Sequence, residues 1–187
     1  MNKSILALIF SMFLAAPMFA ADLGGRVISI GSDTTYPPHE FIEDGVVKGF
    51  DVDVVAAICE RINCVPNWVT TAWDGIFPAL ADGQFDMVVS GVTITEERDK
   101  IVDFSDPYII VQQGILMRVS DKGATIDDFK SGAMKLASQV GTTNATLGEE
   151  LVGRDNLALF DSFNLSLIHI SEPTRRTPIS YAVFCLK

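Results

Sequence analysis

Residues 85–98, FDMVVSGVTITEER, decide the fold that we expect for this chain. The apolar run 87–89 predicts a short strand that is covered on both faces. Ser90 and Gly91 then interrupt this run at a point where a backbone can approach a ligand closely. A buried strand that ends in small polar residues and leads into a helix is the layout of an anion-binding site.

Thr95 is predicted to cap a helix over residues 96–101, since acids follow it in the first turn. Arg98 takes the third helical position, from which its guanidinium can turn back toward Thr93 and the free backbone N–H groups. A carboxylate there would meet charge-assisted hydrogen bonds that contribute roughly 1.5–3 kcal/mol each. The segment alone leaves a second interpretation open, in which Arg98 is a surface arginine paired with a preceding glutamate.

Strand and helix patterns alternate along the rest of the chain. The first part has predicted strands at 26–32, 66–71 and 86–90 and predicted helices at 50–62, 75–82 and 96–101. This βαβαβα order predicts a parallel sheet with helices on both faces. Residues 112–114, Gln-Gln-Gly, are interpreted as a hinge. A second α/β unit follows, with strands at 115–118, 135–139 and 157–160 and helices at 126–131 and 143–152.

The first 21 residues are predicted to be a secretory signal peptide. Lys3 is the only charged residue among the first twenty, and an apolar run covers residues 5–16. This run is shorter than the roughly 20 apolar residues that span a bilayer, which disfavours a permanent anchor. We therefore expect the mature protein to be exported and soluble.

Composition and charge narrow the class of protein. A chain of 187 residues with 48% hydrophobic residues can form one packed domain or two small ones. The formal net charge of −10 argues against nucleic acid or an anionic membrane as the partner.

Cys59 and Cys64 lie five residues apart in a chain that we expect to be exported. A disulfide at the end of a helix is favoured over two free thiols. A zinc site is disfavoured because His39 and His169 lie far from this pair in sequence, and we expect no bound metal.

Polar and aromatic residues follow the predicted strands. In open parallel sheets, ligands bind outside the carboxyl ends of the strands, so these residues belong together. They combine an arginine, hydroxyls, aromatic rings and one carboxylate: Asp33, Tyr36, Trp73, Ser90, Gly91, Thr93, Arg98, Thr142 and Thr143. Each has a structural explanation by itself, as a core aromatic, a turn residue or a helix cap. Because such residues follow four of the predicted strands, those at 26–32, 66–71, 86–90 and 135–139, we predict a binding site.

At these residues the chain resembles a known family, the periplasmic amino-acid-binding proteins of ABC importers. These are extracellular solute-binding proteins of the polar-amino-acid type. The resemblance covers about residues 26–164 and rests on an ordered set of motifs: GSDTTYPPHEF at 31–41, GFDVDVVAAI at 49–58, AWDGIFPAL at 72–80, SGVTITEER at 90–98, DFSDPY at 103–108 and VGTT at 140–143.

The resemblance implies a bilobed α/β fold like that of periplasmic binding proteins, with lobe 1 over 22–111 and lobe 2 over 112–164. It also implies amino acid transport, in which a monomer captures a free polar or basic L-amino acid in the periplasm and docks on an ABC permease of the inner membrane. No cofactor and no catalytic residue are expected.

Roles for single residues are implied in the same way. Arg98 corresponds to the arginine that holds the ligand α-carboxylate, helped by Thr93 and Thr143. Gly91 offers a carbonyl to the α-ammonium, with Ser90 nearby.

The ligand side chain is implied to lie between Tyr36 and Trp73. Asp33 matches an acid that meets an ammonium or a polar or cationic side chain, and Gln139 falls where selectivity is often set. Asp33 and the net acidity fit arginine, lysine or histidine, whereas the aromatic pair and Gln139 fit glutamine, so both ligand types stay open.

The resemblance stops after Asn164. We expect residues 165–187 to be a foreign tail, although a frameshift or a divergent extension also fits. Lobe 1 is then nearly complete and lobe 2 partial, without the family's second-lobe aspartate for the ligand ammonium. Such a truncated fragment is expected to bind weakly or not at all, because an unpaired ammonium is costly to desolvate, and to expose sheet edges.

Two other function classes share this scaffold. A periplasmic cyclohexadienyl or arogenate dehydratase needs a general acid or base, for which only Asp33, His39 and Glu40 lie near the first junction. His39 is expected on a loop. A sensor module of a membrane receptor is the third class, and we rank binding above both.

Overall fold

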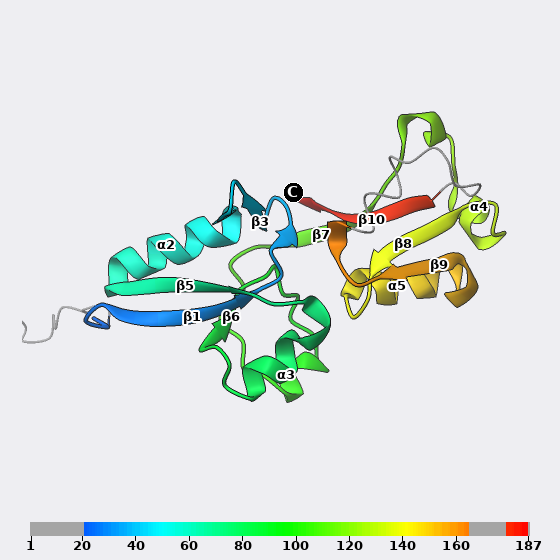
Figure 1. Ribbon diagram of the computed structural model, residues 1–187. Helices are drawn as coiled ribbons and strands as arrows, with labels where there is room; N and C mark the ends of the chain where they lie inside the picture. The colour runs from blue at the N-terminus through cyan, green and yellow to red at the C-terminus, as the bar shows by residue number, and fades with distance from the viewer. Residues whose placement is uncertain (1–20, 165–178, 187) are drawn as a thin grey trace, which may run out of the picture.

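The computed structural model of this protein describes residues 21–164 and 179–186. Its elements form two groups, one around β1 and one around β8, which are joined by the segment that enters β7 (Figure 1). The predicted signal peptide, apart from Ala21, lies outside the described residues, as do residues 165–178. The lobe boundaries and the foreign origin of residues 165–187 stay predictions.

The first group is built on a three-stranded parallel sheet with the order β5-β1-β6. Strand β1 (Arg26–Ser32) pairs along its whole length with β5 (Cys64–Thr70) and at its end with β6 (Met87–Val88). Helix α2 (Phe50–Ile62) and helix α3 (Ile76–Ala81) lie on opposite sides of this sheet (Figure 1). The predicted parallel sheet with helices on both faces is confirmed.

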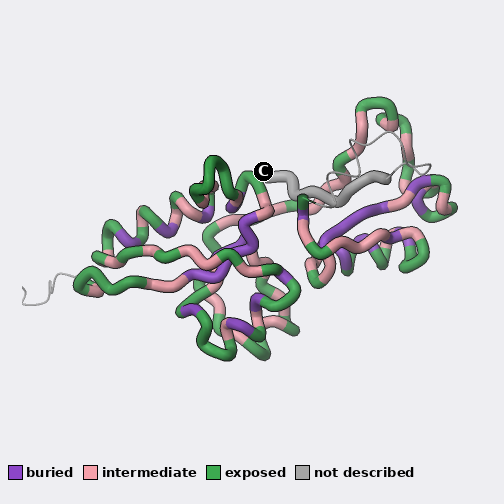
Figure 2. The backbone as a smooth tube through the Cα atoms, in the orientation of Figure 1, coloured by how far each residue is buried: buried purple, intermediate pink, exposed green. Residues whose placement is uncertain are grey.

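Apolar residues at helical spacing hold α2 on the sheet. Val55 and Cys59 lie one turn apart on its inner face and pack with Ile30 and Val89. On the other side, a second cluster packs around α3 and contains Trp73, Ile76, Ala79 and Phe85. The buried segments of Figure 2 follow the end of β1 and the inner faces of these helices.

The second group has a four-stranded sheet with the order β7-β10-β8-β9. Its strands are β7 (Val111–Leu116), β8 (Lys135–Gln139), β9 (Leu157–Phe160) and β10 (Ile179–Leu186). Strand β10 runs antiparallel to β7 and parallel to β8. Helices α4 (Ile126–Lys130) and α5 (Thr143–Val152) complete the group, whose core is formed by Phe129, Met134, Leu136, Val152 and Leu157.

A third, antiparallel sheet was not predicted. It consists of β2 (Thr35–Tyr36), β3 (Glu40–Glu43) and β4 (Val46–Lys48). Strands of two to four residues are too short for an alternating pattern to show. This sheet carries the chain from the end of β1 back to the start of α2.

One sequence prediction was wrong. The helix expected at 96–101 is a 3-10 turn, η2 (Arg98–Lys100), because Ile101 stays 63% exposed and no apolar face is buried to stabilise a longer helix. Residues 112–114, interpreted as the hinge before the second lobe, lie inside β7, where the ladder to β10 runs through Gly114. Their role as a hinge stays a prediction. Further 3-10 turns of the same length occur at η1 (Trp73–Gly75), η3 (Val119–Asp121) and η4 (Arg154–Asn156).

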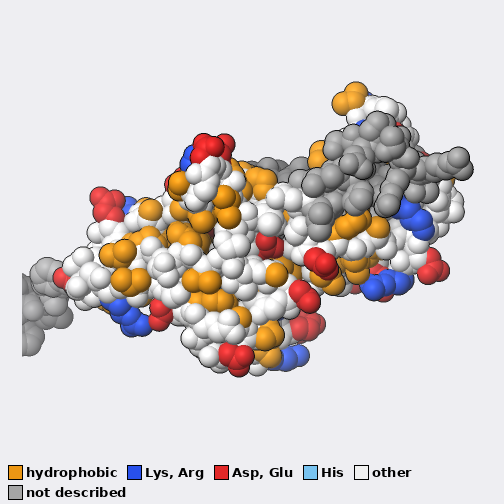
Figure 3. All heavy atoms as spheres, in the orientation of Figure 1, with side chains coloured by type: hydrophobic (Ala, Val, Ile, Leu, Met, Phe, Trp, Pro, Cys, Tyr) orange, Lys and Arg blue, Asp and Glu red, His pale blue; other side chains and the backbone are white. Residues whose placement is uncertain are grey.

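Hydrophobic side chains on the visible face are interspersed with charged and polar ones (Figure 3). Among the described helices, none has the length and apolar character that crossing a membrane requires.

The expected disulfide joins Cys59, near the end of α2, to Cys64, the first residue of β5, with the two Cα atoms 4.5 Å apart. Asn63 makes the tight turn between them by adopting a left-handed conformation. The bond therefore ties the end of α2 to the edge of the first sheet.

We expect replacement of both cysteines by serine to lower the free energy of unfolding by about 2 kcal/mol, because the unfolded chain loses a short covalent loop. Urea unfolding with and without a reductant measures this. Reductant should destabilise the wild type and leave the double variant unchanged. Equal stability of the two proteins would contradict the expectation.

Candidate functional site

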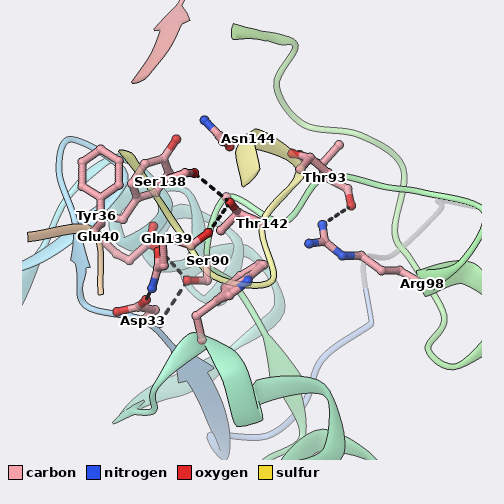
Figure 4. A pocket seen from close by; sticks show the side chains of 14 residues that line it. Asp33, Tyr36, Glu40, Ser90, Thr93, Arg98, Ser138, Gln139, Thr142 and Asn144 are labelled. Atoms are coloured by element: carbon pink, nitrogen blue, oxygen red, sulfur yellow. Dashed lines mark hydrogen bonds between the residues drawn. The ribbon is translucent and has the colours of Figure 1, made fainter. Parts of the chain in front are cut away.

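A cavity of about 40 Å³ lies where the carboxyl ends of β1, β6 and β8 meet the start of α5. Residues from both groups of elements line it (Figure 4). All ten residues predicted for the site are among them: Asp33, Tyr36, Trp73, Ser90, Gly91, Thr93, Arg98, Gln139, Thr142 and Thr143. Four further lining residues were not predicted as ligand contacts, namely Glu40, Ser138, Asn144 and Phe163.

Arg98 turns back toward Thr93, as expected. Its Nη1 donates to the Thr93 carbonyl at 2.8 Å, and its Nη2 donates to the Gly141 carbonyl at 3.1 Å. The Thr95 hydroxyl accepts from the Arg98 N–H at 3.2 Å, but the helix that Thr95 was expected to cap does not form, and the turn η2 starts after Glu97. Partial burial lowers the pKa of the Arg98 guanidinium, which nevertheless stays protonated. Within the described residues, no ion pair joins it to a glutamate.

Trp73 supports the guanidinium from one side. The Arg98 Cζ lies 5.2 Å from the centroid of the Trp73 ring and 5.2 Å from that of Phe77, which are cation–π distances. The Trp73 Nε1 donates to the Gly141 carbonyl at 2.9 Å. Gly141 therefore receives hydrogen bonds from two side chains of the first group.

Asp33 holds the second contact between the two groups. Its Oδ2 accepts from Gln139 Nε2 at 2.6 Å, and its Oδ1 accepts from the Thr35 hydroxyl at 2.8 Å. Asp33 and Gln139 are both buried. In Figure 4 this pair lies on the opposite side of the view from Arg98 and Thr93, so the cavity has a cationic end and an acidic end.

The Ser90–Gly91 break is held by two buried acids. The Ser90 hydroxyl donates to Glu40 Oε1 at 2.5 Å and accepts from the Asp33 N–H at 3.0 Å. The Gly91 N–H donates to Asp51 Oδ2 at 2.7 Å. Gly91 has φ +53°, and an added Cβ would lie 3.1 Å from the Tyr36 ring, so the position requires glycine.

Burial acts differently on the two acids. It raises the pKa of Glu40 to about 10, against the lowering effect of the Ser90 hydrogen bond. Burial alone would also raise the pKa of Asp51, but hydrogen bonds from His39 and Gly91 outweigh it and leave that pKa below its usual value.

The start of α5 contributes hydroxyl and amide groups. Thr142 caps the helix and accepts from the Ala145 N–H at 3.1 Å, as predicted. The Thr143 hydroxyl accepts from Gln113 Nε2 at 3.1 Å. Asn144 is 3% exposed, and neither atom of its side-chain amide has a hydrogen-bond partner among the described residues. Its amide is therefore available to a ligand.

Aromatic rings close the acidic end. Tyr36 stacks on His39 with ring centroids 4.9 Å apart, and the Phe163 ring meets Tyr36 edge-on at 4.9 Å. His39 lies in the turn between β2 and β3, as expected, but is only 2% exposed. Burial raises the pKa of Tyr36, so its hydroxyl stays protonated at neutral pH.

His39, Glu40 and Asp51 are the only group of three potential metal ligands within the described residues, and their ligand atoms lie within 4.8 Å of one another. The acids already accept hydrogen bonds from Ser90 and Gly91. We assign no metal to this group. His169, the other histidine of the chain, lies outside the described residues.

Three hydrogen bonds join the two groups beside this cavity: Gln139 to Asp33, and Trp73 and Arg98 to Gly141. A ligand that binds these same groups would have to exchange with these bonds.

The residues that the sequence analysis missed carry weak sequence signals. Glu40 and Asp51 were visible as acids in apolar surroundings, PPHEF and GFDVDV, where a buried acid needs a partner. Asn144 lies two residues after the cap Thr142, in the first turn of the predicted helix. Phe163 gives no such signal, because its position depends on how β9 ends.

Comparison with known proteins groups the chain with amino-acid-binding proteins. Residues 28–179 match the family described as bacterial extracellular solute-binding proteins, family 3. The chain is 36% identical over 145 residues to a "Probable histidine-binding protein" of Neisseria gonorrhoeae, covering 77% of this chain and 54% of that protein. It is 37% identical over 119 residues to an "L-arginine-binding protein" of Pseudomonas aeruginosa, covering 63% and 44%.

Among solved structures, the chain is similar to an ancestral arginine-binding protein bound to arginine. The TM-score is 0.76 and the identity 30%, with 86% of this chain and 71% of that chain covered. The chain spans about half the length of the two curated relatives.

We expect Asn144→Ala to raise the free energy of unfolding by about 1 kcal/mol, because it removes two buried polar atoms without partners and introduces a better helix former. Chemical denaturation measures the change. Asn156→Ala is the matched control, because the Asn156 amide donates to the carbonyls of Lys130 and Val152 at 3.1 Å each. That variant should be destabilised by about 1 kcal/mol, and the same loss in both variants would refute the expectation.

Proposed function

The chain belongs to family 3 of the bacterial extracellular solute-binding proteins, and from that premise we propose that it binds a polar or basic L-amino acid for an ABC importer. The observation that carries this proposal is the convergence of a cation and a buried acid on one cavity. Arg98 stands at one end, and Asp33 stands at the other.

A zwitterion suits this arrangement. Its carboxylate can replace the carbonyls of Thr93 and Gly141 as the acceptor for the Arg98 guanidinium, which gains two charge-assisted hydrogen bonds. The N–H groups at the start of α5 and the Thr93 hydroxyl lie on the same side of the cavity.

Asp33 is proposed to receive the ligand's cationic or amide side chain in place of Gln139. The bond from the Gln139 amide to Asp33 shows that this carboxylate accepts an amide N–H in the present geometry. A guanidinium or ammonium would add charge complementarity, because Asp33 is 5% exposed. The relatives named for histidine and arginine support a basic ligand.

Location and partners follow from the same proposal. We place the protein in the periplasm, delivered by the signal peptide over residues 1–21, where it acts as a monomer and docks on the permease of the importer. Relatives are named as periplasmic binding proteins for histidine or arginine.

Catalysis is ranked below binding. The three residues considered for acid–base chemistry already have hydrogen-bond partners in the protein. His39 contacts Asp51, and Glu40 accepts from Ser90. Asp33 accepts from Gln139 and Thr35. The named relatives are binding proteins. We therefore propose that the protein has no enzymatic activity.

Arg98→Ala should weaken binding of L-arginine by tenfold or more, at about 1.5–3 kcal/mol for each lost charge-assisted bond. Amide NMR titrations detect both micromolar and millimolar binding. Agmatine, which is arginine without its carboxylate, is the matched ligand. Wild type should prefer arginine to agmatine, and the variant should bind both alike. A preference that survives in the variant would refute the role of Arg98.

Asp33→Asn should weaken binding of arginine about tenfold and change binding of glutamine by less than about twofold, because it removes a buried negative charge but keeps a hydrogen-bonding group. The same titrations measure this. Asp74→Asn removes an exposed negative charge outside the cavity. It is the control for the effect of net charge on the affinity for a cationic ligand. Equal loss for both ligands would argue against Asp33 as the site of the ligand cation.

A further inference from the structure

Two carboxyl groups lie close together at the cavity wall, to which Glu40 belongs. Glu40 and Asp51 are each 0% exposed, and their oxygens lie within 4.8 Å of one another. Glu40 comes from the start of β3 and Asp51 from the first turn of α2. Two charged carboxylates at such a short distance in a site without water repel each other strongly, so one of them tends to keep its proton.

The hydrogen bonds show which oxygen lacks a donor. Ser90 has one hydroxyl proton, which points to Glu40 Oε1 because the hydroxyl oxygen already accepts from the Asp33 N–H. Asp51 Oδ2 accepts from the Gly91 N–H, and its Oδ1 lies 3.4 Å from His39 Nδ1. Glu40 Oε2 is buried and has no partner that donates to it among the described residues.

The proton belongs on Glu40 rather than on Asp51. Asp51 lies in the first turn of α2, where the helix dipole favours negative charge, and accepts from Gly91 as well as facing His39. Glu40 accepts a single bond, from Ser90. Glu40 Oε2 accepts no hydrogen bond from a described residue. A proton on this oxygen would allow it to donate to the nearby Asp51 carboxylate.

We propose that Glu40 is a neutral carboxylic acid that accepts from Ser90 and donates to Asp51, and that it thereby positions Ser90 and Gly91 at the cavity wall. Glu40 is then a positioning residue and not a ligand for the substrate cation. Its part in ligand binding rests on the proposed function, whereas its protonation does not.

The neighbouring acids favour the neutral form of Glu40. The titratable groups around Glu40 are Asp33 after β1, Tyr36 in β2, His39 in the next turn, Asp51 in α2 and Tyr108 before β7. Burial is the main cause that raises the pKa of Glu40, to about 10, and the charges of Asp51 and Asp33 add to it. Burial also raises the pKa of both tyrosines, so neither is charged at neutral pH.

Stability as a function of pH tests the proposal without a ligand. The unfolded chain releases the Glu40 proton above a pKa of 4.5, whereas the folded protein keeps it up to about 10. Between these values the wild-type unfolding constant should rise about tenfold per pH unit relative to Glu40→Gln, whose amide donates to Asp51 at every pH. Urea unfolding of both full chains from about pH 5.5 to 8.5 measures the ratio.

Glu43→Gln is the control, because Glu43 lies on the same strand, is exposed and pairs with Lys48. Its unfolding constant should keep a fixed ratio to the wild type over this range. A ratio for Glu40→Gln that stays flat would overturn the proposal, since it would mean that Glu40 is charged in the folded protein. A rise in wild-type stability on adding Zn²⁺ that Glu40→Gln abolishes would also overturn it, because a metal would hold both acids deprotonated.

Infrared spectroscopy of the wild type alone gives a second, independent test. The C=O band of a protonated carboxylic acid should be present at neutral pH and persist to mildly alkaline pH, where exposed carboxyls are ionised. Glu40→Gln should remove it. Absence of the band from the folded wild type would refute the proposal even if no variant folds.

Ligand titration separates positioning from direct recognition. Glu40→Gln should keep the affinity for arginine within about twofold, and Glu40→Leu should lose about tenfold, because Ser90 then lacks an acceptor. A tenfold loss in Glu40→Gln would mean that a charged Glu40 binds the ligand cation, which contradicts the proposal. If no amino acid binds the wild type, the proposed function fails, while the pH and infrared results still decide the state of Glu40.

Discussion

Parallel pairing of β1 with β5 and β6 is the interaction on which the rest of the structure depends. It brings the strand ends to one edge, where Asp33 follows β1 and Ser90 follows β6. The hydrogen bond from the Asp33 N–H to Ser90 is a direct consequence of this alignment. Asp86 secures β6, because its carboxylate accepts from the Ser29 N–H and from Arg26. Asp33 and Ser90 both line the cavity from that edge.

The two groups of elements meet through polar contacts and through the edge-on contact of the Phe163 ring with Tyr36. Gly141 accepts from Trp73 and Arg98, and Gln139 donates to Asp33. These are the groups that a zwitterionic ligand would use, so protein and ligand compete for the same donors and acceptors. Such an exchange costs little, since each bond that is broken is replaced by another of the same kind.

Much of the fold could be predicted because its elements carry clear local patterns. The strands Arg26–Ser32, Lys135–Gln139 and Leu157–Phe160 and the helices Phe50–Ile62 and Thr143–Val152 agree with the predicted bounds. An error occurred where the local pattern and the tertiary packing disagree. Residues 96–101 resemble a helix, yet no partner covers Ile101.

The sequence by itself determined ten of the residues that reach the cavity, because strand ends in a parallel sheet share one edge and the residue types after each strand can be listed without a structure. Only the tertiary structure decided how those residues are paired and charged. Glu40 and Asp51 are eleven residues apart in the chain, and nothing in their local sequence shows that their carboxyl groups share one dry space. Burial and the proximity of other charges decide whether an acid is protonated, and both arise only when the chain has folded.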